Sequence, residues 1–183
     1  CCTSANATQV VEAVAAEFGV DTVIFLPDRF LGAHVASQTP VRLVLWHGSC
    51  EVHETFTAQQ VRHTREQFHA RVVAHPECPP DVLAEADFVG STTAMGAWLE
   101  KEKPERVALV TECSMADNLK SRFPDIEFVK PCNLCPYMQR ITLPNIHACL
   151  LERKHVVHVP EDIAAGARRA LERMLAVGRR DRV

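Results

Sequence analysis

The sequence predicts an α/β protein in which parallel strands alternate with helices. Short apolar runs rich in β-branched residues alternate with amphipathic stretches, and polar residues follow the end of each run. Such an alternation favours parallel βαβ units joined by right-handed crossovers. We therefore expect two similar three-layer domains, over residues 1–69 and 70–140, followed by C-terminal helices over 141–183. Within the two domains we expect successive three-strand units, roughly at 3–69 and 70–131.

The elements of the first predicted domain follow from hydrophobic periodicity. Apolar residues at helical spacing predict helices, and Gly19 is placed to end the first of them as a C-cap. Runs of β-branched and apolar residues predict buried strands. The predicted strands are the opening residues up to Ser4, 22–26 and 41–46, and the predicted helices are 8–18, 29–37 and 57–68.

The same alternation predicts the elements of the rest of the chain. Apolar runs indicate strands at 71–74, 88–89, 107–110 and 126–129. Helical spacing indicates helices at 80–85, 93–100 and 114–121, and two longer C-terminal helices at 143–153 and 160–177.

Composition excludes several classes of protein. The chain has 183 residues, of which 47% are hydrophobic and 23% charged, as in a compact globular domain. Its net charge is −3, so no overall positive field would gather nucleic acid or anionic membranes. No apolar run is long enough to span a bilayer. We expect neither a nucleic-acid nor a membrane partner.

The cysteines and the helical content together indicate the compartment. Eight cysteines are many for a chain of this size, yet good helices and long apolar strands do not need disulfide staples. A reducing, cytoplasmic environment is the better interpretation. There, each cysteine would be either a packing residue or a metal ligand.

Polar side chains gather where the predicted strands end. Ligands of parallel sheets bind beyond the carboxyl ends of the strands, so these positions predict an active site. The alternative is that loops are polar in any case and that Ser and Thr cap the helices that follow. The strand-end residues are Thr3-Ser4, Asp28, Cys50 with His53, His75 with Glu77, Ser91-Thr92 and Thr111-Glu112.

Cys132 and Cys135 form the strongest local motif, a C-x-x-C followed by proline. Such a pair is compatible with half of a zinc site, with a redox pair, or with iron–sulfur ligation. Cys50 is the best second ligand, because it follows a strand end and has His53 three residues later. The sequence assigns no role to Cys78 and Cys113, whereas Cys149 is expected in the core.

The strand-end segments together resemble those of quinolinate synthases. The matching segments are TSANA (3–7), LPDRFLG (26–32), LWHGSCEVHETF (45–56), AHPECP (74–79), DFVGST (87–92), TE (111–112) and NLCPYM (133–138). The resemblance covers nearly the whole chain. It implies three similar α/β domains around a pseudo-threefold axis. It also implies condensation of iminoaspartate with dihydroxyacetone phosphate to quinolinate, the pyridine precursor of NAD. The implied cofactor is a [4Fe-4S] cluster whose open iron acts as a Lewis acid.

The resemblance also implies roles for individual residues. Cys50 and Cys135 match two of the three cysteine ligands of the cluster. His75 and Glu77 match a substrate-binding and acid–base pair, and His53 matches a histidine near the cluster with a catalytic role.

Three hydroxyl-bearing residues complete the implied site. Ser4 matches a serine that contacts the substrate. Ser91 and Thr92 match the residues that hold the anionic end of the substrate.

The resemblance leaves the first domain of the family and its cysteine unmatched. We expect that domain to precede Cys1, in the same or another chain, and we expect the present chain alone to be inactive and to self-associate. A functional link to L-aspartate oxidase is implied as well. Two alternatives stay open: an inactive truncated remnant, and a zinc-binding interaction module that uses Cys132 and Cys135.

Overall fold

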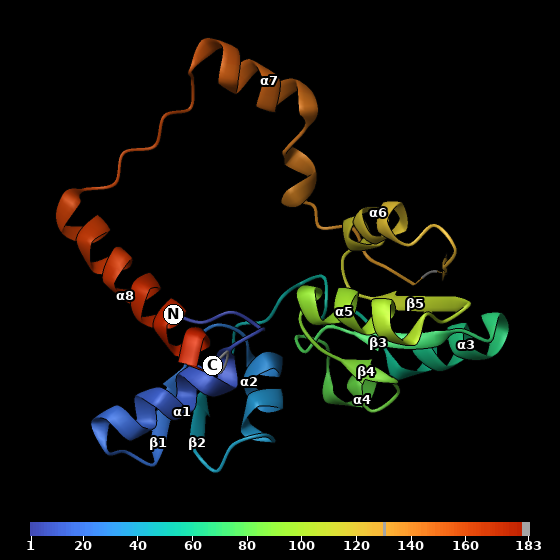
Figure 1. Cartoon of the computed structure of the whole chain (residues 1–183), viewed down its shortest axis with the longest axis horizontal. Coiled ribbons are helices and arrows are strands. Elements are labelled where there is room, and N and C mark those ends of the chain that lie inside the picture. Colours follow the sequence, from blue (N-terminus) through green and yellow to red (C-terminus); the bar gives the residue numbers. More distant parts are fainter. Residues whose placement is uncertain (130, 181–183) are drawn as a thin grey trace. The chain divides into compact units, whose positions relative to one another are not determined.

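The computed structural model describes residues 1–129 and 131–180 (Figure 1). Its described residues divide into two compact units, one of residues 2–134 and one of Cys1 with the residues from Cys135 onward. The first unit contains two parallel sheets with helices between the strands, which confirms the predicted α/β class. Repetition of one domain architecture, with boundaries after residues 69 and 140, stays a prediction.

The first sheet has two strands, β1 (Thr22–Phe25) and β2 (Arg42–Leu45), which pair in parallel. Helices α1 (Ala7–Phe18) and α2 (Arg29–Ala36) contribute to a buried cluster with Phe25 on one side of this sheet. The alternate residues of the strands point the other way, and Ile24 and Val44 are exposed. This sheet is therefore covered on one face. Gly19 ends α1 with a positive φ of 62°, as predicted.

The predicted strand at the start of the chain does not form. Residues 3–6 make a turn instead, in which Asn6 N donates to Thr3 O at 3.1 Å. The side chain of Asn6 tightens this turn, because its Oδ1 accepts from Thr3 N at 2.8 Å. Local side-chain hydrogen bonds of this kind compete with strand pairing. The first sheet therefore has two strands rather than three.

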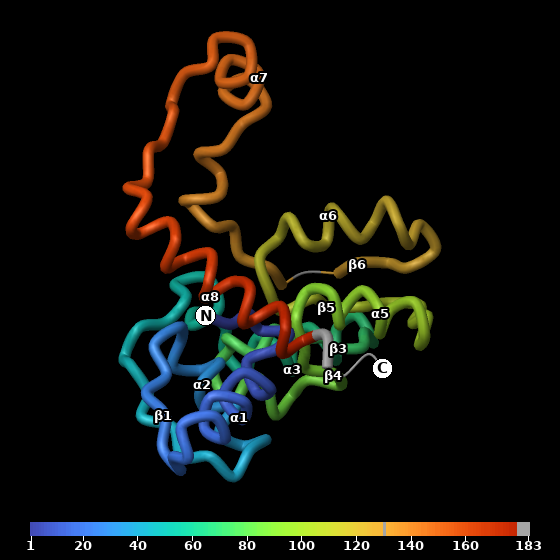
Figure 2. The backbone as a smooth tube through the Cα atoms, turned by 60° about the vertical axis from the view of Figure 1, so that its left-hand side comes forward, coloured from blue at the N-terminus to red at the C-terminus, as the bar shows by residue number. Residues whose placement is uncertain are grey.

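The second sheet has four parallel strands in the order β4-β3-β5-β6, which confirms the four predicted strand segments and corrects the expected three-strand unit at 70–131. The strands are β3 (Arg71–Ala74), β4 (Phe88–Val89), β5 (Arg106–Val110) and β6 (Glu127–Val129). The helices around them are α3 (Ala58–Phe68), α4 (Pro80–Leu83), α5 (Thr92–Glu102) and α6 (Cys113–Arg122). Figure 2 follows the backbone through these elements and shows α6 beside β6.

Helices cover both faces of the four-stranded sheet. Val72 of β3 belongs to a cluster with Val61 of α3 and Val82 of α4. Its neighbour Val73 points to the opposite face and belongs to a cluster with Leu99 of α5. Because successive residues of a strand alternate between the faces, both clusters need apolar residues throughout the strand. This part of the chain is three-layered, as expected.

One disulfide corrects the expectation that every cysteine packs or binds metal. Cys113 and Cys132 are bonded, with Cα atoms 4.9 Å apart. A parallel bridge between Glu112 and Asn133 holds the start of α6 beside the segment that follows β6, so the two cysteines meet. Cys132 is therefore bonded to Cys113 rather than to Cys135.

The second unit contains α7 (Leu143–Glu152) and α8 (Glu161–Arg180), close to the predicted bounds. No residue of α7 is buried, and Leu150 is 76% exposed. Cys149 is half-buried rather than in a core, with its thiol donating to Lys154 O at 3.2 Å. Over the described residues, each helix is too short or too polar to cross a lipid bilayer.

Candidate functional site

Several of the predicted site residues meet where the strands of the first unit end. His53, His75 and Thr111 are buried polar residues there, each less than 8% exposed. Two of them follow strands of the four-stranded sheet, β3 and β5, whereas His53 belongs to the segment after β2. Buried polar groups need partners, so the contacts among them define what the site can do.

His75 is held at both ring nitrogens. Glu77 N donates to its Nδ1 at 3.4 Å, so Nδ1 is an acceptor and the proton of the neutral ring lies on Nε2. That Nε2 lies 3.2 Å from Ser4 Oγ and donates to it. The hydroxyl proton of Ser4 is thereby left to donate to another group.

The electrostatic surroundings keep His75 neutral. Burial is the largest effect, and the adjacent His53 adds to it, while Glu77 opposes both. Together they lower the pKa of His75 to about 4. At neutral pH the ring is an uncharged donor at Nε2, because protonating it would place a charge in a desolvated position.

Glu77 faces both histidines. Its Oε2 lies 3.1 Å from Nδ1 of His53 and 3.7 Å from Nδ1 of His75. Burial raises the pKa of Glu77, but the contact with His53 and the attraction of both imidazoles outweigh it, so the net pKa is below its ordinary value. Glu77 is therefore an ionised carboxylate with a position suited to accept a proton.

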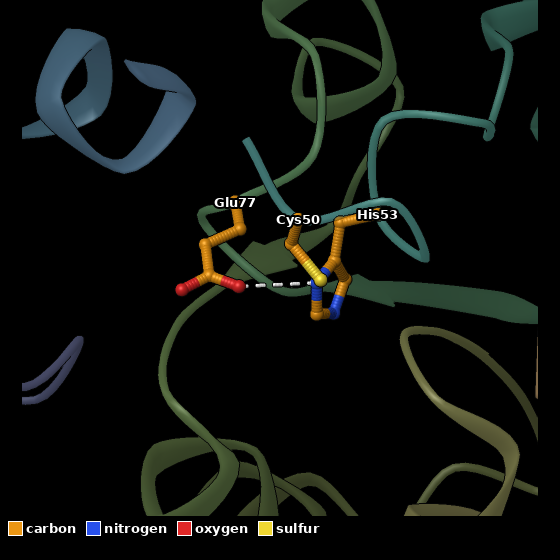
Figure 3. A group of neighbouring side chains, drawn as sticks. All are labelled: Cys50, His53 and Glu77. Atoms are coloured by element: carbon orange, nitrogen blue, oxygen red, sulfur yellow. Dashed lines mark ion pairs between the residues drawn. The ribbon is translucent and has the colours of Figure 1, made fainter. Parts of the chain in front are cut away.

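His53 is fixed by contacts with residues that follow two strands. Its Nε2 lies 2.9 Å from Thr111 Oγ1, and its ring stacks on His75 with centroids 4.6 Å apart. These contacts orient Nδ1 toward Glu77 (Figure 3). The stacked pair therefore presents a single orientation to the site.

Cys50 is positioned through the buried Asp28 at the end of β1. One carboxylate oxygen of Asp28 accepts from Phe30 N and Leu31 N at 2.8 Å and caps α2. The other accepts from Cys50 N, also at 2.8 Å. Burial raises the pKa of the Cys50 thiol, and the negative charges of Glu77 and Asp28 act in the same direction.

Three potential metal ligands converge in this region. Cys50, His53 and Glu77 each offer one donor atom, and these atoms all lie within 4.8 Å of one another. Figure 3 shows that Cys50 and His53 come from one segment and that Glu77 reaches them from the segment after β3.

A pocket lies beside Ser4, the hydrogen-bond partner of His75. Its volume is about 280 Å³, and Ser4, His34 and Gly90 are among its lining residues. The first turn of α1 also lines it, and no side chain caps that helix. An uncapped helix N-terminus favours an anion, because its N–H groups carry partial positive charge.

Ser91 and Thr92 lie at the beginning of α5. Ser91 is the N-cap residue, and its Oγ accepts from Ala94 N at 3.3 Å. Thr92 is exposed. Ser91 therefore caps the helix, which was the alternative to a role in the active site. Gly90, the residue before it, lines the pocket.

The other predicted cysteine positions separate into three kinds. Cys135 lies outside the disulfide and belongs to the second unit. Cys78 is a buried core residue whose thiol donates to Val110 O at 3.5 Å, and burial raises its pKa. Cys113 and Cys132 are consumed by the disulfide, so neither offers a thiolate in this state.

Three residues contribute to the site without an assigned role in the sequence. Asp28 and Thr111 are polar residues at strand ends, and this position in the sequence is the feature that could have identified them. Asn133 carries a weaker signal, its place between the two cysteines of the C-x-x-C motif. Its Nδ2 donates to Val52 O at 3.2 Å and to Thr55 Oγ1 at 2.8 Å, which ties this motif to the His53 segment.

Comparison with known proteins places the chain in a family. The family model described as quinolinate synthetase A protein (NadA) matches residues 1–176. Quinolinate synthase 2 of Mesorhizobium japonicum is 54% identical over 178 residues, which are 97% of this chain and 54% of that protein. Quinolinate synthase of Xylella fastidiosa strain 9a5c is 53% identical over 178 residues, which are 97% of this chain and 51% of that protein.

Quinolinate synthase of Agrobacterium fabrum is 53% identical, again over 97% of this chain and over 50% of that protein. The chain thus spans about half the length of the curated relatives that it matches. The match to the family model extends over nearly all of its residues, including every segment that carries the resemblance. The chain belongs to the quinolinate synthetase A protein family.

Proposed function

We propose that this chain supplies part of the active site of a quinolinate synthase. The reaction is condensation of iminoaspartate with dihydroxyacetone phosphate to quinolinate, with release of phosphate and water. An L-aspartate oxidase is the proposed source of the iminoaspartate. The observation that carries the proposal is the convergence of Ser4, His53, His75 and Glu77 in a chain of this family.

The proposed cofactor is a [4Fe-4S] cluster with Cys50 and Cys135 as two of its ligands. Both cysteines lie outside the disulfide and are half-buried, so their thiols suit iron–sulfur ligation. The third cysteine would come from a first domain in the same or another chain. When bound, the cluster supplies a Lewis acid that polarises a substrate oxygen.

Glu77 is the proposed general base. Its lowered pKa keeps it ionised at neutral pH, and it lies within reach of Nδ1 of His53. A proton that Glu77 takes from the substrate can pass to His53, which Thr111 holds at the opposite nitrogen. Positioned acid–base groups of this kind contribute about 10²–10⁴-fold to a rate.

Ser4 and His75 are proposed to bind substrate oxygens. Neutral His75 donates to Ser4, and Ser4 can then donate its own proton to a carboxylate or phosphate oxygen. The adjacent pocket and the uncapped start of α1 would receive the same anionic group. Ser91 and Thr92, at the start of α5, are the proposed contacts for the other anionic end.

A hybrid protein tests this function. The 183 residues replace the matching half of Mesorhizobium japonicum quinolinate synthase 2, and the purified hybrid is assayed anaerobically for quinolinate. We expect activity in the hybrid, a loss of about 100-fold with Glu77→Gln, and less than a twofold change with the exposed Glu66→Gln. A Glu77→Gln hybrid as active as Glu66→Gln contradicts the proposed base.

Binding gives a second measurement if the hybrid fails to fold. Calorimetric titration of the 183-residue chain with quinolinate should show weak binding that Ser4→Ala and His75→Ala each reduce at least about tenfold. His63→Ala, on the exposed side of α3, should leave it unchanged. Equal binding by all variants would place the ligand elsewhere.

A further inference from the structure

Cys50, His53 and Glu77 bring three different metal-ligating atoms together within the first unit. The sulfur, the nitrogen and a carboxylate oxygen all lie within 4.8 Å of one another. Figure 3 shows the three side chains converging, with the sulfur of Cys50 beside the imidazole. Thiolate, imidazole and carboxylate are the donors that Zn²⁺ accepts in proteins.

A second observation points to a ligand at this place. Nδ1 of His53 is buried and has no hydrogen-bond partner of acceptable geometry among the described residues, and its side chain is 9% exposed. Glu77 Oε2 faces this nitrogen at 3.1 Å, and its carboxylate is itself one of the three potential ligands. A buried nitrogen without such a partner is costly unless something else binds it.

The surrounding contacts resemble those that orient metal ligands. A ligating histidine is held at its other nitrogen by a polar group, and Thr111 Oγ1 does this for His53 at 2.9 Å. The loop that carries Cys50 is held by Asp28 through the Cys50 amide at 2.8 Å. The two positions that must stay in place are therefore supported by buried residues.

We propose that Cys50, His53 and Glu77 form a mononuclear Zn²⁺ site with an open fourth position. Three protein ligands and one open position are typical of exchangeable or catalytic zinc, whereas structural zinc has four protein ligands. Bonds of about 2.0–2.3 Å to a tetrahedral ion place its donors about 3.5 Å apart, so the ligands need to move by roughly 1 Å. Cys50 and Glu77 are half-buried and can make that movement by rotating their side chains.

This site is distinct from a zinc site at the C-x-x-C motif. Cys132 is bonded to Cys113, so that motif has lost one of its thiols. The proposed site needs neither Cys132 nor Cys135. One consequence rests on the proposed function: because Cys50 would serve both metals, bound Zn²⁺ would prevent assembly of the iron–sulfur cluster at that residue.

Metal titration of the cluster-free 183-residue chain tests the site. Zn²⁺ affinity is measured by competition with a chromophoric chelator, and Co²⁺ serves as the spectroscopic probe. We expect one ion per chain and a thiolate-to-cobalt charge-transfer band that Cys50→Ser abolishes. His53→Ala and Glu77→Gln should each weaken Zn²⁺ binding by at least about 10-fold, the lower end of the range for supporting residues.

Matched variants control for the loss of a donor elsewhere. Cys149→Ser, His63→Ala and Glu66→Gln remove the same kinds of group from other parts of the chain and should leave the affinity unchanged. Thr111→Val should weaken Zn²⁺ binding by about 10-fold through the orientation of His53. Circular dichroism verifies that each variant is folded.

Two results would overturn the site. Zn²⁺ binding that survives His53→Ala and Cys50→Ser places the ion elsewhere, and binding lost with Cys135→Ser assigns it to the C-x-x-C segment. Neither result depends on quinolinate synthesis, because no cluster and no substrate are present. Conversely, an inactive hybrid enzyme leaves the metal titration of this chain unaffected. Addition of Zn²⁺ before anaerobic iron and sulfide reconstitution then tests the competition separately.

Discussion

The two sheets of the first unit differ in how they are covered. In the four-stranded sheet, β3 and β5 are buried on both faces, and Val72 and Val73 are fully inaccessible although they point in opposite directions. In the two-stranded sheet, Phe25 is buried whereas its neighbour Ile24 is 69% exposed. Leu26 and Trp46, just beyond the strands, are exposed as well.

The two sheets contribute different residues to the site. The four-stranded sheet supplies His75 and Thr111, which follow strands that are packed on both faces. The half-covered sheet leads into the segment that carries Cys50, which is held mainly through Asp28. The site thus combines residues that follow the fully covered strands with Cys50 and His53, which both lie in the segment after β2. The exposed apolar face of the two-stranded sheet is where we expect chains to associate.

The largest expected difference is in stability after truncation of matched strand residues. Leu109→Ala in β5 should lower the free energy of unfolding by about 2–5 kcal/mol, because it empties a site that is 2% exposed. Ile24→Ala in β1 should change it by less than about 0.5 kcal/mol. Urea denaturation of both variants measures the contrast, and equal losses would mean that the two sheets are equally buried in solution.

The disulfide should make the next largest contribution to stability. Its two cysteines follow β5 and β6 of the four-stranded sheet. The double substitution Cys113→Ser with Cys132→Ser should lower stability by about 3 kcal/mol, because the bond closes a loop with a sequence separation of 19. Thiol titration in denaturant should find six thiols before reduction and eight after it. Eight thiols without reductant would show that the bond does not form.

Acidification should lower the free energy of unfolding through His75, which follows β3 of the four-stranded sheet. Its pKa of about 4 in the folded chain lies below the ordinary value of 6.5, so between these two values the unfolded chain binds the proton and the folded chain does not. Stability should therefore fall as pH is lowered from about 6.5 to about 4, by at most about 1.4 kcal/mol per pH unit for one group. The pKa of Glu77 is also lowered in the folded chain, so the unfolded chain takes up this proton first as pH falls. Stability should therefore fall further at lower pH.

Urea denaturation of the metal-free chain at several pH values measures this slope. His75→Gln should flatten it, whereas the exposed His63→Ala should leave it as it is. A slope that His75→Gln does not change would assign the effect to other groups.

Loss of the Asp28 carboxylate, which lies after β1 of the two-stranded sheet, should lower the free energy of unfolding by a smaller amount. Asp28→Ala removes the cap of α2 and the hydrogen bond from Cys50 N, so we expect a loss of about 1–2 kcal/mol. The exposed Asp21→Ala in the same region is the control. Hydrogen exchange at the Cys50 amide should become faster in Asp28→Ala and not in Asp21→Ala; an unchanged rate would separate Asp28 from the position of Cys50.

The smallest effect on stability should come from the exposed face. Ile24→Lys should change the free energy of unfolding by less than about 0.5 kcal/mol but reduce self-association, because exposed apolar patches favour contact between chains. Sedimentation velocity over a range of concentrations measures this, with the exposed Gln59→Lys as a charge-matched control. A wild-type chain that stays monomeric throughout would contradict the expectation.

Much of the fold could be predicted because its signals are local. The helix periodicity, the β-branched runs and the position of Gly19 predicted nearly every element within a few residues of its observed bounds. The exception at the chain start has a local cause too, since the Asn6 side chain closes a turn where a strand was expected. The candidate site was partly predictable for a related reason: strand ends of parallel sheets meet at one edge, and polar residues marked them.

The rest depended on distances between residues far apart in the sequence. Ser4 and His75 are 71 residues apart, and so the hydrogen bond between them has no sequence signature. The disulfide likewise depends on the pairing of Glu112 with Asn133 rather than on the C-x-x-C spacing. Residue types and their order therefore sufficed for the α/β class, the family and the set of reactive groups. Protonation states, the choice of disulfide partner and the convergence of Cys50, His53 and Glu77 required the packed chain, because burial and short contacts exist only after the strands have come together.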